Sequence, residues 1–170
     1  MEEDRYRAIE RELLDAKEEL ESAFHYAAIG KAIVGLDGSF LRVNRALCEL
    51  VGYSEEELLA VSFQEITHPA DLDADLDFVR QMIAGEIDTY QMEKRYLGKD
   101  GSSIPVLLSV SLVRSPDGEP LRFVSQIQDW RNEIERRELA RELEARWRAD
   151  ALSVLAGGLA HDFNNLLVGI

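Results

Sequence analysis

The sequence has little of several features that would point at once to a compartment or a membrane. Cys48 is its only cysteine in 170 residues, so no disulfide can form within the chain and nothing indicates an oxidising compartment. No apolar run approaches the roughly 20 residues that span a bilayer. The charged start Glu2-Glu3-Asp4 is unlike a signal peptide. These features predict a cytoplasmic chain without a membrane segment.

Basic residues are also scarce relative to acidic ones. Nineteen Lys and Arg face 33 Asp and Glu, which gives a formal net charge of −14. Such a charge argues against nucleic acid or an anionic membrane as a partner, and it favours solubility. The hydrophobic share of 46% and the charged share of 31% are typical of a globular domain with extended amphipathic helix. The length suits one compact domain with appendages.

Residues 1–29 carry a heptad repeat of apolar side chains. Charged residues such as Glu10, Lys17 and Glu18 fill the other faces. The apolar positions are Tyr6, Ile9, Leu13, Ala16, Leu20, Ala23 and Ala27. We expect a helix that pairs two chains into a homodimer, either parallel or antiparallel. The alternative is an amphipathic helix that lies on its own domain.

From residue 30 the pattern changes to short strands and tight turns. Residues 32–36 and 40–43 predict a β-hairpin, because Asp37-Gly38 between them supplies a positive-φ turn. Turn clusters separate three further strands nearer the C-terminus, expected over residues 89–97, 104–114 and 121–128. Apolar residues alternate with polar ones in the middle strand of these three, so one face of the sheet should form the core.

Several helices are expected between the hairpin and these three strands. One covers residues 45–51, and a second begins at the capping box formed by Ser54 and Glu57. After an apolar stretch, His68-Pro69 begins a longer helix. Its predicted buried face is Leu72, Leu76, Val79, Met82 and Ile83. The order of elements predicts an α+β domain with helices on one face of an antiparallel sheet.

The span from about Phe24 to Asp129 resembles a PAS domain. The resemblance is carried by Asn44-Arg45-Ala46, Gly52-Tyr53-Ser54, His68-Pro69, Lys99-Asp100-Gly101 and Gln128-Asp129. It implies a five-stranded antiparallel sheet in the order 2-1-5-4-3, with helices that enclose a pocket. The family commonly ends its last strand with Asp-Ile-Thr, whereas this chain has Asp129-Trp130-Arg131. The acid of this motif is kept and its threonine is replaced. Our hypothesis is that these three residues pass a signal from the sheet to the helix that follows.

The sequence identifies no cofactor and no metal site for the pocket that this resemblance implies. His68 is expected to cap a helix rather than to bind haem, and Cys48 does not lie in the Asn-Cys-Arg motif of flavin-binding light sensors. The acidic run 71–75 lacks the Gly and Glu of a calcium loop, since Leu76 and Met82 stand there. The residues expected in the core, and as its pocket lining, are Ile33, Leu50, Ile66, Phe78, Met82, Leu108 and Phe123.

Residues 130–152 are rich in Glu and Arg and contain neither Gly nor Pro. We expect one long helix, too polar to stand alone and therefore paired with a copy of itself. In residues 153–170, a step of about 100° per residue turns His161 away from the apolar stripe of the helix. Asn165 lies one turn later on the same face as His161, and Asp162 directly follows His161 in the sequence.

The run around His161-Asp162-Phe163-Asn164-Asn165 resembles the phosphoacceptor box of sensor histidine kinases, especially hybrid ones. The resemblance implies that His161 accepts the γ-phosphoryl group of ATP, that Asp162 orients or deprotonates the imidazole, and that Asn165 assists phosphoryl transfer or hydrolysis. A neutral imidazole is a nucleophile near pH 7. The resemblance also implies two partners, an ATP-binding kinase domain and a response regulator receiver.

Four segments with different roles are therefore predicted. Residues 1–29 form a dimerisation helix, 30–129 a PAS sensor domain, 130–152 a signalling helix, and 153–170 the start of a phosphoacceptor helix. The predicted function is PAS control of autophosphorylation at His161 in a two-component sensor histidine kinase. Because the sequence has no ATP-binding domain, we expect ATP to act only through a kinase domain outside it. The alternative is a non-enzymatic dimeric PAS module that binds a ligand or a partner.

Overall fold

The computed structural model describes the secondary structure of residues 2–168 and the side chains of residues 5–152. His161, Asp162 and Asn165 lie outside the residues whose side chains are described, so their roles stay predictions. The chain divides into two compact units, Met1–Trp130 and Arg131–Ile170. The first unit contains the sheet and its helices, and the second is a single helix.

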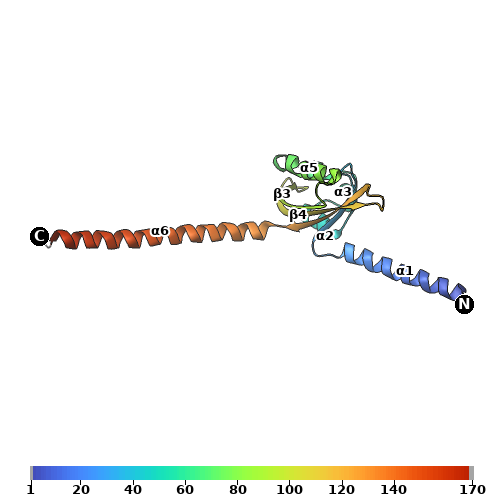
Figure 1. The fold of residues 1–170 in the computed structure, drawn as a ribbon, viewed down its shortest axis with the longest axis horizontal. Helices are drawn as coiled ribbons and strands as arrows, with labels where there is room; N and C mark the ends of the chain where they lie inside the picture. The colour runs from blue at the N-terminus through green and yellow to red at the C-terminus, as the bar shows by residue number, and fades with distance from the viewer. Residues whose placement is uncertain (1, 169–170) are drawn as a thin grey trace. The chain divides into compact units, whose positions relative to one another are not determined.

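The sheet of the first unit, drawn as arrows in Figure 1, has five antiparallel strands. Their spatial order is β2-β1-β5-β4-β3. The strands are β1 (Gly30–Val34), β2 (Phe40–Val43), β3 (Thr89–Leu97), β4 (Ser103–Arg114) and β5 (Pro120–Asp129). β5 lies in the centre, between β1 and β4, and β3 is an edge strand. The predicted fold class and strand order are confirmed.

The hairpin of β1 and β2 is present, but β1 ends earlier than predicted. Gly35 leaves the strand, because its N–H donates to the Ser39 carbonyl at 2.9 Å and its own carbonyl accepts from the Gly38 N–H at 3.0 Å. Gly38 has a φ of 91°, the positive value that the Asp-Gly pair predicted. Leu36, expected in the strand, lies in this turn and is 43% exposed.

Three helices begin where the sequence predicts, at residues 45, 55 and 69, whereas residues 63–66, expected only as an apolar stretch, form a further short helix, and the first helix ends before residue 29. Those of the first unit are α1 (Glu2–His25), α2 (Arg45–Val51), α3 (Glu55–Leu59), α4 (Phe63–Ile66) and α5 (Pro69–Ala84). Ser54 and Glu57 form the predicted capping box of α3. The Nδ1 atom of His68 accepts a hydrogen bond from the Ala70 N–H at 3.2 Å, so His68 caps α5 as expected.

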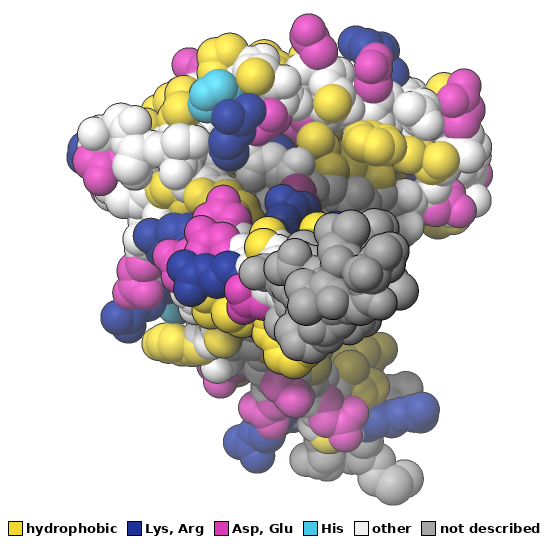
Figure 2. Space-filling view, turned by 90° about the vertical axis from the view of Figure 1, so that its left-hand side faces the viewer, with side chains coloured by type: hydrophobic (Ala, Val, Ile, Leu, Met, Phe, Trp, Pro, Cys, Tyr) yellow, Lys and Arg dark blue, Asp and Glu magenta, His cyan; other side chains and the backbone are white. Residues whose placement is uncertain are grey.

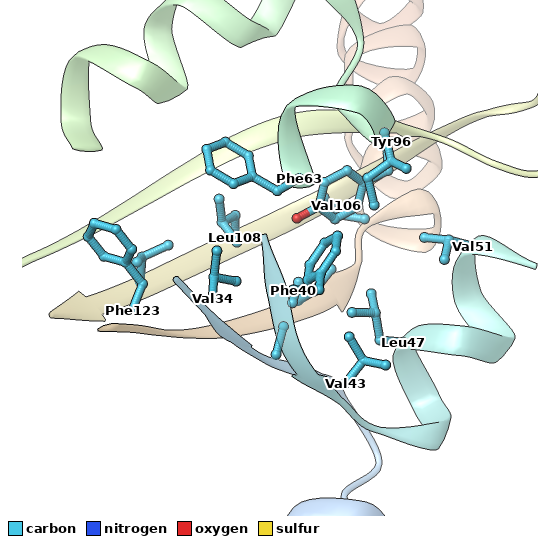
Figure 3. Packing of buried hydrophobic residues seen from close by; sticks show 14 of the residues in the cluster. Val34, Phe40, Val43, Leu47, Val51, Phe63, Tyr96, Val106, Leu108 and Phe123 are labelled. Carbon is cyan, nitrogen blue, oxygen red and sulfur yellow. The ribbon is translucent and has the colours of Figure 1, made fainter. Parts of the chain in front are cut away.

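The core lies between the sheet and helices α2 to α5. Four inward residues of β4 are buried in it, namely Ile104, Val106, Leu108 and Val110. The helices add residues such as Leu47, Leu58 and Met82 to the same cluster, and Figure 3 shows how some of these side chains meet. Burial of this apolar surface is the main force that holds the helices to the sheet.

The prediction that Ile83 belongs to the buried face of α5 is wrong. Ile83 is 41% exposed, whereas Asp75 is 0% exposed. Asp75, Val79 and Met82 follow the spacing of one helix face, and Ile83 falls one residue, or about 100°, beyond Met82. The acidic residue therefore occupies a core position that the hydrophobic pattern alone left unassigned.

The second unit is α6 (Arg131–Val168), which begins directly after β5 and Trp130. Its described surface carries local ion pairs, such as Arg148–Glu144 at 2.5 Å, and exposed apolar side chains. These apolar residues are Leu139, Leu143, Trp147 and Leu152. Within the described residues, no helix has the length and apolar character needed to cross a bilayer.

Acidic and basic side chains are interspersed over the face of the molecule that Figure 2 shows, with hydrophobic side chains between them. The acidic side chains seen on this face are thus not gathered in one patch. Such a surface favours solubility.

Candidate functional site

The candidate site is a buried ion pair between α5 and β3. The Lys94 Nζ atom lies 2.5 Å from the Asp75 Oδ2 atom, and both side chains are 0% exposed. Charged side chains are almost never fully buried unless they are paired. The pair therefore marks the one place in the described core where charge replaces apolar packing.

Every polar atom of the pair has a neighbour of suitable chemistry. The Tyr90 hydroxyl donates to the second oxygen of Asp75 at 2.6 Å, and Lys94 Nζ also donates to Thr67 Oγ1 at 3.0 Å. The ammonium lies 4.3 Å from the centre of the Tyr96 ring, within the range of a cation–π contact. Such complete pairing is what makes a buried charge tolerable.

Burial dominates the electrostatics of this network. It lowers the pKa of the Lys94 ammonium, and the Asp75 carboxylate opposes that change because it favours the charged form. Burial, together with the Asp75 carboxylate, raises the pKa of the Tyr90 phenol. Burial likewise raises the pKa of Tyr96. Both phenols therefore remain protonated at neutral pH, and Tyr90 acts as a hydrogen-bond donor.

A small cavity borders the network. Its volume is about 20 Å³, which is room for about one water molecule and far below the roughly 300–1,000 Å³ of a typical small-molecule site. Its lining residues are Val34, Phe40, Phe63, Asp75, Val79, Tyr90, Lys94, Tyr96, Leu108, Val110, Phe123 and Ser125. Side chains thus nearly fill the interior, and the charged groups of Asp75 and Lys94 are part of the cavity lining.

Two of the seven residues predicted to line a pocket, Leu108 and Phe123, border this cavity. Ile66 and Met82 are buried in the same core but not among its lining residues. The other three predicted residues, Ile33, Leu50 and Phe78, are only partly buried.

Ile33 and Phe78 each have a specific reason to lie outside the cavity lining. The strand neighbours of Ile33, Ala32 and Val34, are the buried ones, because successive strand residues point to opposite faces. Phe78 instead stacks on the Tyr90 ring, with centroids 4.9 Å apart.

A second ion pair joins the same two elements at the rim of the core. The Asp71 carboxylate accepts three hydrogen bonds from Arg95. The donors are the guanidinium Nε at 2.8 Å, the terminal guanidinium nitrogen Nη2 at 2.7 Å, and the backbone N–H. These hydrogen bonds hold the pKa of Asp71 below its usual value. Asp71 and Asp75, two acids of the run 71–75, therefore both pair with basic residues.

Sequence reasoning missed the buried pair, although a signal for it exists. Lys94 is a lone charge on the inward face of β3, between the buried Tyr90 and Tyr96. Asp75 stands at helical spacing among the apolar residues of α5. An inward lysine on a strand, together with an inward acid on the helix that covers it, would have predicted the contact.

The residues predicted to transfer a signal lie at the junction of the two units. Asp129 is the last residue of β5, and the backbone N–H of Trp130 donates a hydrogen bond to the Pro105 carbonyl at 3.0 Å. Arg131 is the first residue of α6. The chain therefore passes from the central strand to α6 within three residues. The signalling role itself stays a prediction.

Asn44 joins the end of α1 to the sheet and to α2. Its side-chain nitrogen donates to the carbonyls of Phe24 and Ile29, at 3.1 and 2.9 Å. Its side-chain oxygen accepts from the N–H groups of Lys31 at 2.8 Å and Leu47 at 3.0 Å. Because Asn44 is 0% exposed, removal of its amide would leave several backbone groups without a partner.

Comparisons with known proteins agree with this architecture. Residues 40–127, more than half of the chain, match a family described as the PAS fold. A probable diguanylate cyclase of Escherichia coli, DgcE, is 47% identical over 133 residues, which are 78% of this chain and 12% of that protein. The sensor histidine kinase TmoS of Ectopseudomonas mendocina is 26% identical over 88% of this chain and 16% of its own length.

A third relative is the C4-dicarboxylate transport sensor protein DctS of Rhodobacter capsulatus. It is 28% identical over 174 aligned residues, which cover 96% of this chain and 26% of that protein. The chain thus spans between about an eighth and a quarter of the length of these relatives.

Solved structures share the fold. A domain of a sensory box histidine kinase/response regulator from Geobacter sulfurreducens superposes with a TM-score of 0.58 and 23% identity, over 69% of this chain and 96% of that one. The PAS domain of an HTR-like protein from Haloarcula marismortui has a TM-score of 0.59 and 26% identity, over 72% of this chain and 98% of that one.

Proposed function

Because this chain belongs to the PAS fold family, we propose that it is the sensory and signal-relay part of a two-component sensor histidine kinase. In this proposal, residues 30–129 sense the input, residues 130–152 carry it, and His161 within residues 153–170 accepts a phosphoryl group. The single Cys48 and the acidic composition support a cytoplasmic location.

The observation that carries the proposal is the reach of the similarity to sensor proteins. The alignment with DctS covers 96% of this chain, so it includes His161 wherever the few unaligned residues lie. A named sensor histidine kinase, TmoS, aligns over 88% of the chain. Together with the resemblance of residues 157–167 to a phosphoacceptor box, this supports His161 as the acceptor.

The proposed chemistry is a phosphoryl transfer to an imidazole. A ring nitrogen of His161 attacks the γ-phosphorus of ATP, a phosphorus–nitrogen bond forms, and ADP leaves with the electrons of the broken phosphorus–oxygen bond. Asp162 stabilises the positive charge that develops on the ring, and Asn165 assists on the same helix face. A kinase domain presents the ATP, and a response regulator receiver takes the phosphoryl group.

The proposed relay runs through the centre of the sheet. β5 lies between β1 and β4, and it leads through Asp129, Trp130 and Arg131 into α6. A change in the core beside Lys94 would move the sheet, and a small shift of its central strand would reach α6 directly. Two states that differ by a few kcal/mol would be sufficient for such a switch.

A second candidate function follows from the similarity to DgcE, which is 47% identical over 133 residues. In that case the chain is a PAS module that controls a diguanylate cyclase or another output, and His161 is never phosphorylated. That alignment covers 78% of the chain, so about a fifth of the chain lies outside it. The two candidates differ in whether His161 carries a phosphoryl group.

Labelling with ATP separates these candidates. The chain is incubated with radiolabelled ATP and a complete sensor histidine kinase, and acid-labile phosphate is quantified on this chain. The proposal predicts label on the wild type and none on His161→Ala, while the control His25→Ala keeps the label. Equal labelling of the wild type and His161→Ala, or an unlabelled wild type, would contradict the proposal and favour the second candidate.

A further inference from the structure

The cavity beside the buried ion pair has a lining that is partly polar. Its polar lining residues are Asp75, Tyr90, Lys94, Tyr96 and Ser125. The remaining lining residues are apolar, and Figure 3 shows three of them, Val34, Phe63 and Leu108, in the core. Cavities that stay dry are lined by apolar groups, so the polar groups indicate that this cavity takes a polar molecule.

Within the described residues, the Lys94 ammonium has one hydrogen-bond donor left for such a molecule. An ammonium carries three N–H donors. Lys94 uses two of them, on Asp75 Oδ2 at 2.5 Å and on Thr67 Oγ1 at 3.0 Å. The Tyr96 ring lies 4.3 Å from Nζ and attracts the charge through its face, but it does not supply an oxygen acceptor there. The third donor is therefore available to an acceptor inside the cavity.

Ser125 brings a second polar group to the cavity from another strand. It lies on the inward side of β5 between the buried Phe123 and Ile127, and it is 7% exposed. No group in the part of the chain that the structure describes forms a hydrogen bond with its hydroxyl. A buried hydroxyl without a hydrogen bond destabilises a fold. A polar molecule in the cavity would remove that cost.

We propose that the cavity binds one ordered water molecule, which accepts a hydrogen bond from the Lys94 ammonium and donates one to the Ser125 hydroxyl. The volume of about 20 Å³ is that of a single-water site and excludes an organic ligand of ordinary size. A buried water typically makes about three hydrogen bonds, and the Tyr96 hydroxyl belongs to the same lining. The water is thus a part of the fold and not a signal molecule.

This water joins strands that the buried network does not otherwise connect. Lys94 is on β3 and Ser125 is on β5, and β4 lies between them. β5 leads into α6, so the water also links the buried ion pair to the strand used by the proposed relay. The water site itself depends neither on that relay nor on phosphorylation of His161.

The variant Ser125→Val distinguishes a hydrated cavity from a dry one because its effect on stability has opposite signs. In the hydrated cavity, valine displaces the water and leaves a Lys94 N–H without an acceptor. We then expect the urea midpoint of the full chain to fall by about 0.5 M. In a dry cavity, the two methyl groups would fill apolar space and raise the midpoint.

Two controls separate this effect from strand propensity and from crowding. Ser111→Val makes the same change on the exposed side of β4, and it should leave the midpoint unchanged or raise it slightly. Ser125→Val is also made in the background Asp75→Leu/Lys94→Met/Tyr90→Phe, which has no buried charge to hydrate. There it should not lower the midpoint. An equal decrease in both backgrounds would show crowding instead of water loss.

A high-resolution crystal structure of the full chain tests the site directly. We expect one water peak at about 2.7–3.2 Å from both Lys94 Nζ and Ser125 Oγ in the wild type, and no such peak in Ser125→Val. A cavity without a water peak, a water that does not contact Lys94, a raised midpoint for Ser125→Val, or an equal decrease in both backgrounds would each overturn the proposal.

Discussion

Two ion pairs join α5 to β3, and they differ mainly in burial. Asp75–Lys94 lies in the core with both side chains 0% exposed, whereas Asp71–Arg95 lies at the rim with Asp71 19% and Arg95 42% exposed. The acids stand one helical turn apart, and the bases are consecutive residues of β3. Because consecutive strand residues point to opposite faces, one base enters the core and the other reaches the rim.

The difference shows that similar charges on neighbouring residues serve the fold in different ways. An ion pair with a solvent-exposed side chain contributes about 0–1 kcal/mol to the free energy of unfolding. A buried pair gains little net stability over an apolar pair of similar shape, but loss of one partner leaves a charge that the core cannot solvate. The buried pair is therefore sensitive to any change that separates its partners, which suits an interior that responds to a signal.

The variant Lys94→Met tests this comparison with the largest expected effect. It keeps most of the side-chain volume but leaves Asp75 buried without a cation, so we expect a loss of about 3–5 kcal/mol in the free energy of unfolding. Urea denaturation measures it. Lys99→Met is the matched control, because Lys99 pairs with Glu57 at the surface, and it should cost about 0–1 kcal/mol. Equal losses for the two variants would contradict the account.

The variant Tyr90→Phe removes one hydrogen bond from the buried pair and leaves both charges in place. Asp75 then loses the hydrogen bond that the Tyr90 hydroxyl donates to it at 2.6 Å. We expect the free energy of unfolding to fall by about 1–3 kcal/mol. Tyr53→Phe serves as the control, since no hydrogen bond of the described network involves its hydroxyl. A loss for Tyr90→Phe as small as for the control would show that this donor contributes nothing.

The variant Asp71→Asn probes the rim pair and its dependence on pH. Because the folded-state pKa of Asp71 lies below its usual 3.8, its stabilising contribution is present above that pH and is lost as the pH falls towards the lower value. We expect a loss of at most about 1 kcal/mol at pH 7, and a smaller difference from wild type below pH 3.8. A difference that did not change between pH 7 and pH 3 would contradict the assignment.

A small net effect is also expected when the buried network is replaced as a whole. Asp75→Leu, Lys94→Met and Tyr90→Phe together remove both charges and the hydroxyl that would otherwise lack a partner. We expect stability within about 1–2 kcal/mol of wild type, and well above that of Lys94→Met alone. If the losses of the single variants simply added, the interpretation of the pair as mutually dependent would be wrong.

Much of the fold follows from local signals in the sequence. The Ser54/Glu57 capping box, the His68-Pro69 helix start and the Asp37-Gly38 turn act within a few residues, so their structures could be predicted from those residues alone. The alternation in β4 identified its inward face in the same way. The end of β1 was less predictable, because it depends on hydrogen bonds that Gly35 makes across the turn.

The site was harder to predict because its partners are distant in the sequence. Asp75 and Lys94 are 19 residues apart, and Asn44 binds a carbonyl 20 residues away. Periodicity identifies which face of an element is buried, but it does not show which polar side chains meet there. Residues such as Ile33 and Phe78 were placed in the lining from hydrophobicity alone, whereas strand register and ring stacking decide their positions.

If the sheet controls phosphorylation of His161 through Asp129, a change at Asp129 should alter the rate of that phosphorylation. Wild type, Asp129→Ala and the control Asp117→Ala, in the exposed turn between β4 and β5, are labelled in parallel by a complete sensor histidine kinase and ATP. We predict that Asp129→Ala changes the rate of acid-labile labelling severalfold while Asp117→Ala does not. Equal rates for all three proteins would contradict it.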